Sequence, residues 1–147
     1  MLDTFCHWFV GAWYNKRQAY NNPRGQAFVH VLHSPVSEGE FRCTYTYHKK
    51  KSPYRDFHVK VLHNDGIIVV KNPVADINFK LQSGIFVADT EVQVGHTLHV
   101  SKAYLGPNHY YVADQGFDVN NGTQLWGLEP GCMYEFDRSW YFLNAAK

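Results

Sequence analysis

The sequence predicts an all-β fold with little helix, an antiparallel barrel of about ten strands that follows a short N-terminal helix. From Gln26 onward, short runs rich in β-branched and aromatic residues are separated by turn residues about every 8 to 12 positions, which is typical of a meander or barrel. A chain of 147 residues has the size of one domain, so residues 1–147 are expected to fold as one unit. Closure would remove free strand edges and enclose either side chains or one small ligand.

Residues 2–10 are expected to form the helix. Apolar residues recur there at spacings of three and four, namely at Leu2, Phe5 and Phe9. Asp3 or Thr4 is available as the N-cap, and Gly11 is expected to end the helix.

The expected strands follow in order, and some neighbouring runs are expected to merge. They are 26–34, 40–48, 54–63, 66–71, 75–81, 84–88, 91–94, 97–104, 109–114, 123–128 and 132–136. Turn residues separate them, at Ser34-Pro35, Ser52-Pro53, Asn72-Pro73 and Gly106-Pro107-Asn108. The strongest hairpin signals are Asn64-Asp65-Gly66 and Asn120-Asn121-Gly122, because these residues favour tight hairpin turns.

Composition excludes several classes of protein. The formal net charge is +1, so neither nucleic acid nor an acidic membrane is expected as a partner. Three widely spaced cysteines without C-x-x-C indicate neither a disulfide framework nor a zinc site, and nine histidines without H-x-H indicate no metal. Without a signal-peptide pattern or an apolar stretch of membrane-spanning length, the expectation is a soluble cytoplasmic protein.

One expected strand carries two tyrosines on its inward face. Alternation sends Phe41, Cys43, Tyr45 and Tyr47 to the same side. Tyr45 and Tyr47 then bring hydroxyls into the interior, where each needs a partner or a ligand. Two core tyrosines bonded to backbone carbonyls would explain the pattern as well, and Cys43 is expected to be a small buried residue rather than a nucleophile.

An arginine heads the next apolar face. Alternation groups Arg55 with Phe57, Val59 and Val61. A buried guanidinium without a partner is costly, so Arg55 should meet a carboxylate of the protein or the acid group of a bound molecule. A two-pronged match to carboxylate would suit a ligand that bears propionates, whereas a position at the solvated rim is the alternative.

A carboxylate ends another apolar face, because Tyr110, Val112 and Asp114 lie on one side of the run 109–114. Asp114 is therefore the natural counter-group for Arg55. An ionised carboxylate accepts several hydrogen bonds at once, and a protonated one could supply a proton. A turn aspartate leading into Gly116 is the alternative.

Two tryptophans receive different expectations. Gly11-Ala12-Trp13 matches the Gly-x-Trp found where the first strand of lipocalin-like barrels begins, and Trp13 is counted among the expected ligand-binding residues. Trp126-Gly127 is expected to close the barrel floor instead. Lys49-Lys50-Lys51 is expected to form a solvated hairpin tip, with partner docking as the alternative.

An ordered set of motifs resembles the T-type (CpcT/CpeT) phycobiliprotein chromophore lyase family. The opening motifs are Gly11-Ala12-Trp13-Tyr14-Asn15, Gln18-Ala19, Pro23 and Phe28-Val29-His30-Val31. The middle motifs are Tyr45-x-Tyr47 and Pro53-Tyr54-Arg55. The closing motifs are Asp114-x-Gly116-Phe117-Asp118, Gln124-Leu125-Trp126-Gly127 and Tyr134-Glu135-Phe136. Because the likeness runs in order over about residues 8–63 and 97–138, the chain is identified as a compact member of that family.

The resemblance implies a lipocalin-like barrel whose lumen holds a linear tetrapyrrole (bilin), either phycoerythrobilin or phycocyanobilin, as bound substrate and not as a prosthetic group. In the family, a cysteine thiol of the phycobiliprotein β-subunit adds to ring A of the bilin. The implied partners are the bilin and the apo-phycobiliprotein β-subunit, and a homodimer is left open.

The resemblance also implies roles for individual residues. Arg55 would hold a propionate, and Asp114 would contact the pyrrole nitrogens as the catalytic carboxyl. Tyr45, Tyr47 and Tyr54 would contact the tetrapyrrole. Phe57 and Trp13 complete the expected ligand-binding set.

Two departures from the family pattern support a different reading. The stretch between Ile67 and Gly95 looks shorter and lacks the family's cysteine-containing segment, and Gln115 stands where the family usually has arginine. A bilin carrier or chaperone without lyase activity is therefore the alternative function. A carrier of fatty acids or retinoids would share the barrel but would have no need of the closing Asp-x-Gly-Phe-Asp motif.

Overall fold

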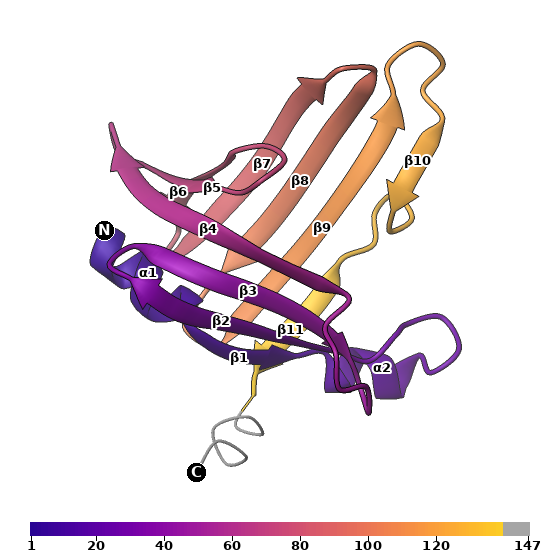
Figure 1. The fold of residues 1–147 in the computed structure, drawn as a ribbon, viewed down its shortest axis with the longest axis horizontal. Helices are drawn as coiled ribbons and strands as arrows, with labels where there is room; N and C mark the ends of the chain where they lie inside the picture. Colours follow the sequence, from indigo (N-terminus) through magenta and orange to yellow (C-terminus); the bar gives the residue numbers. More distant parts are fainter. Residues whose placement is uncertain (140–147) are drawn as a thin grey trace.

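One antiparallel sheet makes up most of residues 1–139, the part of the chain that the computed structural model describes (Figure 1). The elements in order are α1 (Leu2–Phe9), β1 (Gly11–Tyr14), α2 (Lys16–Asn21), β2 (Val29–Ser37), β3 (Glu40–Tyr47), β4 (Arg55–Asn64), β5 (Ile67–Lys71), β6 (Ile77–Gln82), β7 (Ile85–Val94), β8 (Thr97–Leu105), β9 (His109–Asp118), β10 (Gln124–Gly127) and β11 (Tyr134–Arg138). The predicted all-β class, with a short N-terminal helix, is confirmed.

The long strand β9 closes the sheet into a barrel. One edge of β9 pairs with β8 from Tyr110 to Asp118. Its other edge pairs with two short strands in succession, β11 along His109–Val112 and β10 along Gln115–Phe117. Because β10 and β11 share one place in the wall, eleven strands make a barrel that is ten strands around, as predicted.

Most predicted strands lie where the sequence placed them, and the runs 84–88 and 91–94 merge into β7, as expected for some neighbouring runs. The turn predicted at Ser34-Pro35 is wrong, because Pro35 lies within β2 opposite Phe41, and an irregularity between Pro35 and Ser37 accommodates a residue that cannot donate to the ladder. Helix α2 was not predicted.

The hairpin predicted at Asn64-Asp65-Gly66 is confirmed and joins β4 to β5. Asp65 and Gly66 have φ angles of 49° and 76°, and two successive left-handed residues give the turn whose twist matches the flanking strands.

Helix α1 plugs one end of the lumen. Its Phe5 ring meets the rings of Phe79 and Phe86 edge-on at 5.0 and 5.1 Å, and its Phe9 ring stacks on His33 at 3.8 Å. The caps predicted at Asp3 or Thr4 are wrong: the N-cap is Met1, and it makes no side-chain capping bond.

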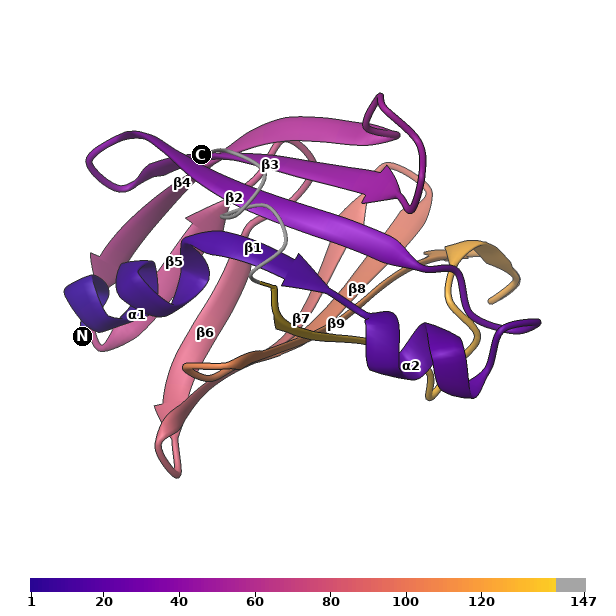
Figure 2. The ribbon, with the colours of Figure 1, turned by 90° about the horizontal axis from the view of Figure 1, so that it is seen from below.

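The two helices flank β1, α1 before it and α2 after it (Figure 2). Helix α2 is tied to the C-terminal part of the wall, because the Gln18 amide donates to the Met133 carbonyl at 2.7 Å. No helix in residues 1–139 has both the length and the hydropathy needed to span a bilayer.

Near α1 the lumen is a packed core that contains one buried histidine. The His33 Nδ1 lies 2.7 Å from the Phe9 carbonyl, which can only accept, so Nδ1 carries the proton. Burial lowers the pKa of His33 to about 4. The folded protein therefore holds this ring in its neutral form.

We expect His33 to make the barrel sensitive to acid. The unfolded chain takes up a proton near pH 6.5 and the folded chain only near pH 4, so the contribution is intact above pH 6.5 and declines as the pH falls toward 4. The loss should reach about 3 kcal/mol in the free energy of unfolding. Urea titrations at pH 7, 5 and 4 should show it in the wild type and show it reduced in His33→Asn, which keeps a donor but does not titrate.

The control is His63→Asn, because His63 is exposed on β4. It should follow the wild-type dependence. Parallel loss of stability in wild type and His33→Asn between pH 6.5 and 4 would show that His33 is not responsible.

Candidate functional site

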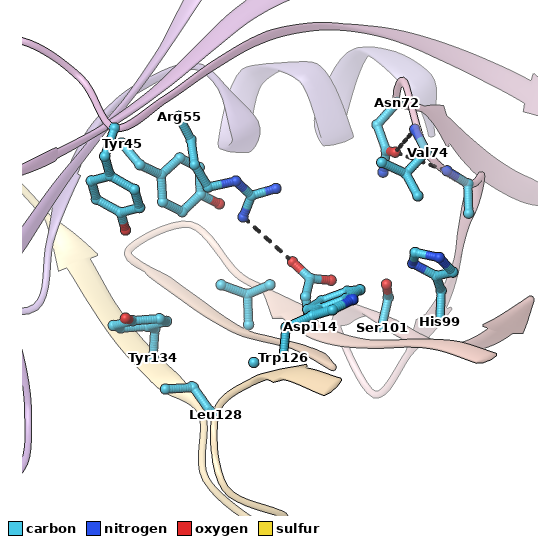
Figure 3. A pocket seen from close by; sticks show the side chains of 14 residues that line it. Tyr45, Arg55, Asn72, Val74, His99, Ser101, Asp114, Trp126, Leu128 and Tyr134 are labelled. Atoms are coloured by element: carbon cyan, nitrogen blue, oxygen red, sulfur yellow. Dashed lines mark hydrogen bonds and ion pairs between the residues drawn. The ribbon is translucent and has the colours of Figure 1, made fainter. Parts of the chain in front are cut away.

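The lumen beyond the packed core holds an outer pocket of about 470 Å³, within the ~300–1,000 Å³ usual for small-molecule sites (Figure 3). One wall comes from β3, β4, the loop that joins them and the loop between β5 and β6, and contributes Tyr45, Tyr54, Arg55, Asn72, Val74 and Ala75. The facing wall comes from β8 to β11 and contributes His99, Ser101, Val112, Asp114, Trp126, Gly127, Leu128 and Tyr134.

A smaller inner chamber of about 40 Å³ lies on the side of α1, whose Phe9 lines it. It is otherwise bordered mainly by buried core residues, among them Cys43 and Tyr110, and by the partly buried Phe57. Arg55 and Asp114 line both spaces, so these two charged side chains stand at the junction of the outer pocket and the inner chamber.

The structure brings Arg55 and Asp114 together across the lumen. The Arg55 Nη1 and Asp114 Oδ2 atoms are 3.9 Å apart, with side chains 46% and 28% exposed (Figure 3). The juxtaposition predicted from the two apolar faces is therefore present, but the pair is partly solvated. An ion pair of this kind contributes only about 0–1 kcal/mol to folding, which leaves both groups available to a ligand.

Two aromatic rings support the Arg55 guanidinium. Its Cζ lies 5.0 Å from the ring centroids of both Tyr45 and Phe57. Phe57 lines the inner chamber but not the outer pocket. Phe57 therefore packs against Arg55 from the side of the inner chamber and does not face the outer pocket.

Tyr45 is buried, and it interacts electrostatically with the neighbouring buried Tyr110. Burial raises the pKa of both tyrosines above the ordinary value, so both keep their protons at neutral pH. The core position of Tyr45 left open from the sequence is therefore present, and Tyr45 also lines the outer pocket.

Tyr47 lies at the rim, which corrects its predicted position in the interior. It is 44% exposed, lines neither luminal space, and stacks on Tyr54 with ring centroids 4.2 Å apart. Alternation assigns Tyr47 to the inner face, but β3 ends there, past the enclosed part of the lumen. Tyr54 does line the outer pocket, and burial raises the pKa of its hydroxyl.

The two tryptophans take the reverse of the predicted positions. Trp13 is completely buried, donates from Nε1 to the Phe9 carbonyl at 3.3 Å, and packs under the Arg138 guanidinium at 3.9 Å. It lines neither luminal space. Trp126, predicted to close the floor, lines the outer pocket and is 43% exposed.

Two glycines make room for Trp126 and its strand. A Cβ atom on Gly116 would lie 2.2 Å from the indole Nε1, so the ring lies directly against the Gly116 backbone. A Cβ atom on Gly127 would lie 2.2 Å from the Asp114 carbonyl oxygen. The Trp126 ring also meets His99 at 5.2 Å, so β8, β9 and β10 together place this indole in the pocket wall.

Gln115, the departure noted in the sequence, does not line either luminal space. Its side chain is buried and donates from Nε2 to the Leu128 carbonyl at 2.8 Å. Gln124 donates to the same carbonyl at 2.7 Å. Gln115 thus holds the connection between β10 and β11 in place.

Sequence reasoning missed several pocket residues, among them Asn72, His99, Ser101 and Tyr134. Tyr134 had a signal in the closing motif Tyr134-Glu135-Phe136. Asn72 had only a turn signal, and His99 and Ser101 had none, because their entry into the pocket depends on the pairing of β8 with β9.

A closed barrel with an open pocket, aromatic walls and one opposed charge pair has the architecture of a lipocalin-like barrel. The chain is similar to the solved structure of the T-type phycobiliprotein lyase CpeT from Prochlorococcus phage P-HM1, with a TM-score of 0.80 and 30% identity over 95% of this chain and 98% of that one. The chain belongs to the T-type phycobiliprotein lyase family.

Of the other comparisons, one shows the same fold and two find no match. The CRL protein of Arabidopsis is 14% identical over 94% of this chain and 97% of that one, and its TM-score of 0.76 shows the same fold. No protein-family model and no curated protein matches the sequence.

Proposed function

We propose that this chain binds a linear tetrapyrrole, phycoerythrobilin or phycocyanobilin, in the outer pocket and assists its thioether attachment to a cysteine of a phycobiliprotein β-subunit. The observation that carries the proposal is the Arg55 and Asp114 pair, set across an aromatic pocket of about 470 Å³. A bilin presents acidic propionates and a row of pyrrole nitrogens, which are the groups that an arginine and an aspartate recognise.

In this proposal the bilin replaces the contact between the two charged residues. A propionate binds the Arg55 guanidinium, which the Tyr45 and Phe57 rings already hold in position. Asp114 then loses a single long contact of 3.9 Å and accepts hydrogen bonds from pyrrole N–H groups instead. The exchange is favourable because each new hydrogen bond joins an ionised group to a better-oriented partner.

Aromatic side chains supply the remaining contacts. Tyr54, Tyr134 and Trp126 line the pocket and offer flat faces to the conjugated rings. Their enclosure would restrict the bilin to one conformation and shield its reactive bridges. The contribution of the barrel to the reaction is therefore chiefly orientation.

The nucleophile comes from the partner protein. The thiol sulfur bonds to the ring A side chain, and the thiol proton ends on a bilin carbon, so this addition has no leaving group and needs no oxidant. The nearby thiol of Cys43 is unsuitable, because it is buried outside the outer pocket and burial raises its pKa to about 12. We assign to Asp114, in the pocket wall, the role of holding the proton that is transferred.

A bilin carrier without transfer activity is the second candidate, and Gln115 is the observation that favours it. Gln115 replaces the arginine usual in the family and is engaged with the Leu128 carbonyl. The chain covers 98% of the phage lyase, so no large segment is missing relative to that protein. Attachment assays are therefore needed to separate the two candidates.

Two mixtures of purified components should report binding and transfer separately: the protein with a bilin, and the same mixture with apo β-subunit added. Added phycoerythrobilin or phycocyanobilin should give a sharper, shifted visible absorption band at about one bilin per chain, and it should quench Trp126 fluorescence, because Trp126 lies in the pocket wall. With apo β-subunit present, a lyase should raise the yield of zinc-fluorescent adduct on a denaturing gel above that of the uncatalysed mixture.

The outcomes distinguish the candidates. A shifted band without extra adduct indicates a carrier. An unchanged spectrum with both bilins at micromolar protein would exclude both bilin functions and turn attention to fatty acids or retinoids.

A further inference from the structure

The end of the outer pocket at Asn72, Ser101 and His99 carries polar groups that the roles above do not use (Figure 3). A bilin bears two propionates. Arg55 is the single Lys or Arg side chain among the described residues that line the outer pocket, so it can serve one of them. The inference below rests on the proposed bilin function and concerns the second propionate.

The orientation of the Asn72 amide follows from its hydrogen bonds. Its Oδ1 accepts from the backbone N–H groups of Val74 and Ala75, at 2.9 and 3.0 Å. Because the oxygen is engaged with the loop between β5 and β6, the other end of the amide is the NH₂ group. Within residues 1–139 this NH₂ group makes no hydrogen bond, and Asn72 borders both the outer pocket and the inner chamber.

Two groups on the facing wall lie at the same end of the pocket. Ser101 and His99 are alternate residues of β8, with Ser101 directly opposite Asp114 in the ladder to β9. In the part of the chain that the structure describes, neither side chain makes a hydrogen bond, and the His99 ring rests on Trp126. An amide, a hydroxyl and an imidazole from two walls therefore line this end.

We propose that Asn72, Ser101 and His99 form a second carboxylate subsite, which takes the second propionate of the bilin while Arg55 takes the first. Amide and hydroxyl donors bind a carboxylate through charge-assisted hydrogen bonds without a positive charge of their own. The subsite and Arg55 together fix the direction in which the tetrapyrrole lies along the pocket, and hence which terminal ring reaches the mouth.

The substitution Asn72→Asp tests the subsite with little change in shape. An aspartate oxygen accepts from Val74 and Ala75 as before, so the loop is preserved. The NH₂ group becomes a second carboxylate oxygen, which repels a propionate. The matched control is Asn121→Asp, because Asn121 makes the same kind of turn by accepting from Thr123 at 2.9 Å and lines neither luminal space.

The probes are phycoerythrobilin with free propionates and its dimethyl ester, titrated by visible absorbance into each variant. Asn72→Asp should weaken binding of the free acid by about ten- to a hundred-fold and alter binding of the ester by less than about three-fold. Asn121→Asp should change neither. Ser101→Ala, which cannot disturb the loop, should weaken the free acid selectively by a smaller factor, about three- to ten-fold.

Other results would overturn the subsite. An equal loss for acid and ester in Asn72→Asp would mean that the amide meets another group, such as a terminal lactam. No loss in either Asn72→Asp or Ser101→Ala would mean no contact at all. A wild-type protein that binds neither acid nor ester would instead overturn the proposed function, and the subsite with it.

Discussion

Replacing Arg55 with alanine is expected to weaken bilin binding by about ten- to a hundred-fold and to leave the barrel folded. The affinity falls because a hydrogen bond to a charged group is worth ~1.5–3 kcal/mol, and Arg55 is the guanidinium that lines the outer pocket. Folding should change by less than about 1 kcal/mol, since the ion pair with Asp114 is long and partly solvated. Absorbance titration measures the affinity, and thermal unfolding without bilin checks the fold.

The matched control is Arg42→Ala. Arg42 lies on the outer face of β3 and pairs with Asp56 at 2.6 Å, so its removal also deletes an exposed arginine and an ion pair. It should leave bilin affinity unchanged. If Arg55→Ala binds both bilins as the wild type does, Arg55 is not the propionate site.

Asp114→Asn should change the absorption spectrum of the bound bilin more than it changes the affinity for the bilin. The amide has nearly the same size and keeps one acceptor, so some binding persists. The negative charge beside the pyrrole nitrogens is lost, and the absorption band should shift because it depends on the protonation and conformation of the tetrapyrrole. A spectrum identical to that of the wild-type complex would show that Asp114 does not contact the chromophore.

Gly116→Ala is expected to reduce bilin affinity about ten-fold or more, because it should displace the neighbouring Trp126 ring. The new Cβ would lie 2.2 Å from the Trp126 indole, so the ring must leave its position in the pocket wall. Overpacking of this kind costs ~1–3 kcal/mol, and the ligand also loses a stacking face. Titration measures the affinity, and a shift in tryptophan emission reports the displaced indole.

The control for Gly116→Ala is the same change in a Trp126→Ala protein. Without the indole, whose atoms are the three nearest to the added methyl group, the second substitution should cost little beyond the first. Additive losses in the double variant would show that Gly116 acts through the backbone of β9 and not through Trp126.

Alternation along the strands predicted which side chains face the lumen, but not how far along the lumen they lie. Tyr45, Tyr47, Arg55 and Asp114 were all assigned to inner faces, and only the pairing of β3 with β4 and of β8 with β9 decides their depth. Tyr47 reaches the rim for this reason. A period of two residues carries no information about the tilt of strands or the stagger between them.

The tryptophans show the same limit. Trp13 lies on the short β1, where Arg138 and Phe9 cover it, whereas Trp126 lies on β10, which pairs with the far part of β9. Both have turn-like or glycine neighbours in the sequence, and nothing local distinguishes them. Likewise, Asn72 is recognisable as a turn residue, but only closure of the barrel places it and Ser101 in the walls of one pocket.

The division of one edge of β9 between β10 and β11 has a consequence for how such a protein can change over evolutionary time. The ladder to β11, at His109–Val112, completes the ring of hydrogen bonds around the packed core. The ladder to β10, at Gln115–Phe117, carries Trp126 and Gly127 of the pocket wall. Insertions or exchanges between β10 and β11 can therefore alter what the protein recognises while the ring that keeps it folded stays intact. A graft of this segment from a relative is the natural starting point for engineering a new chromophore preference.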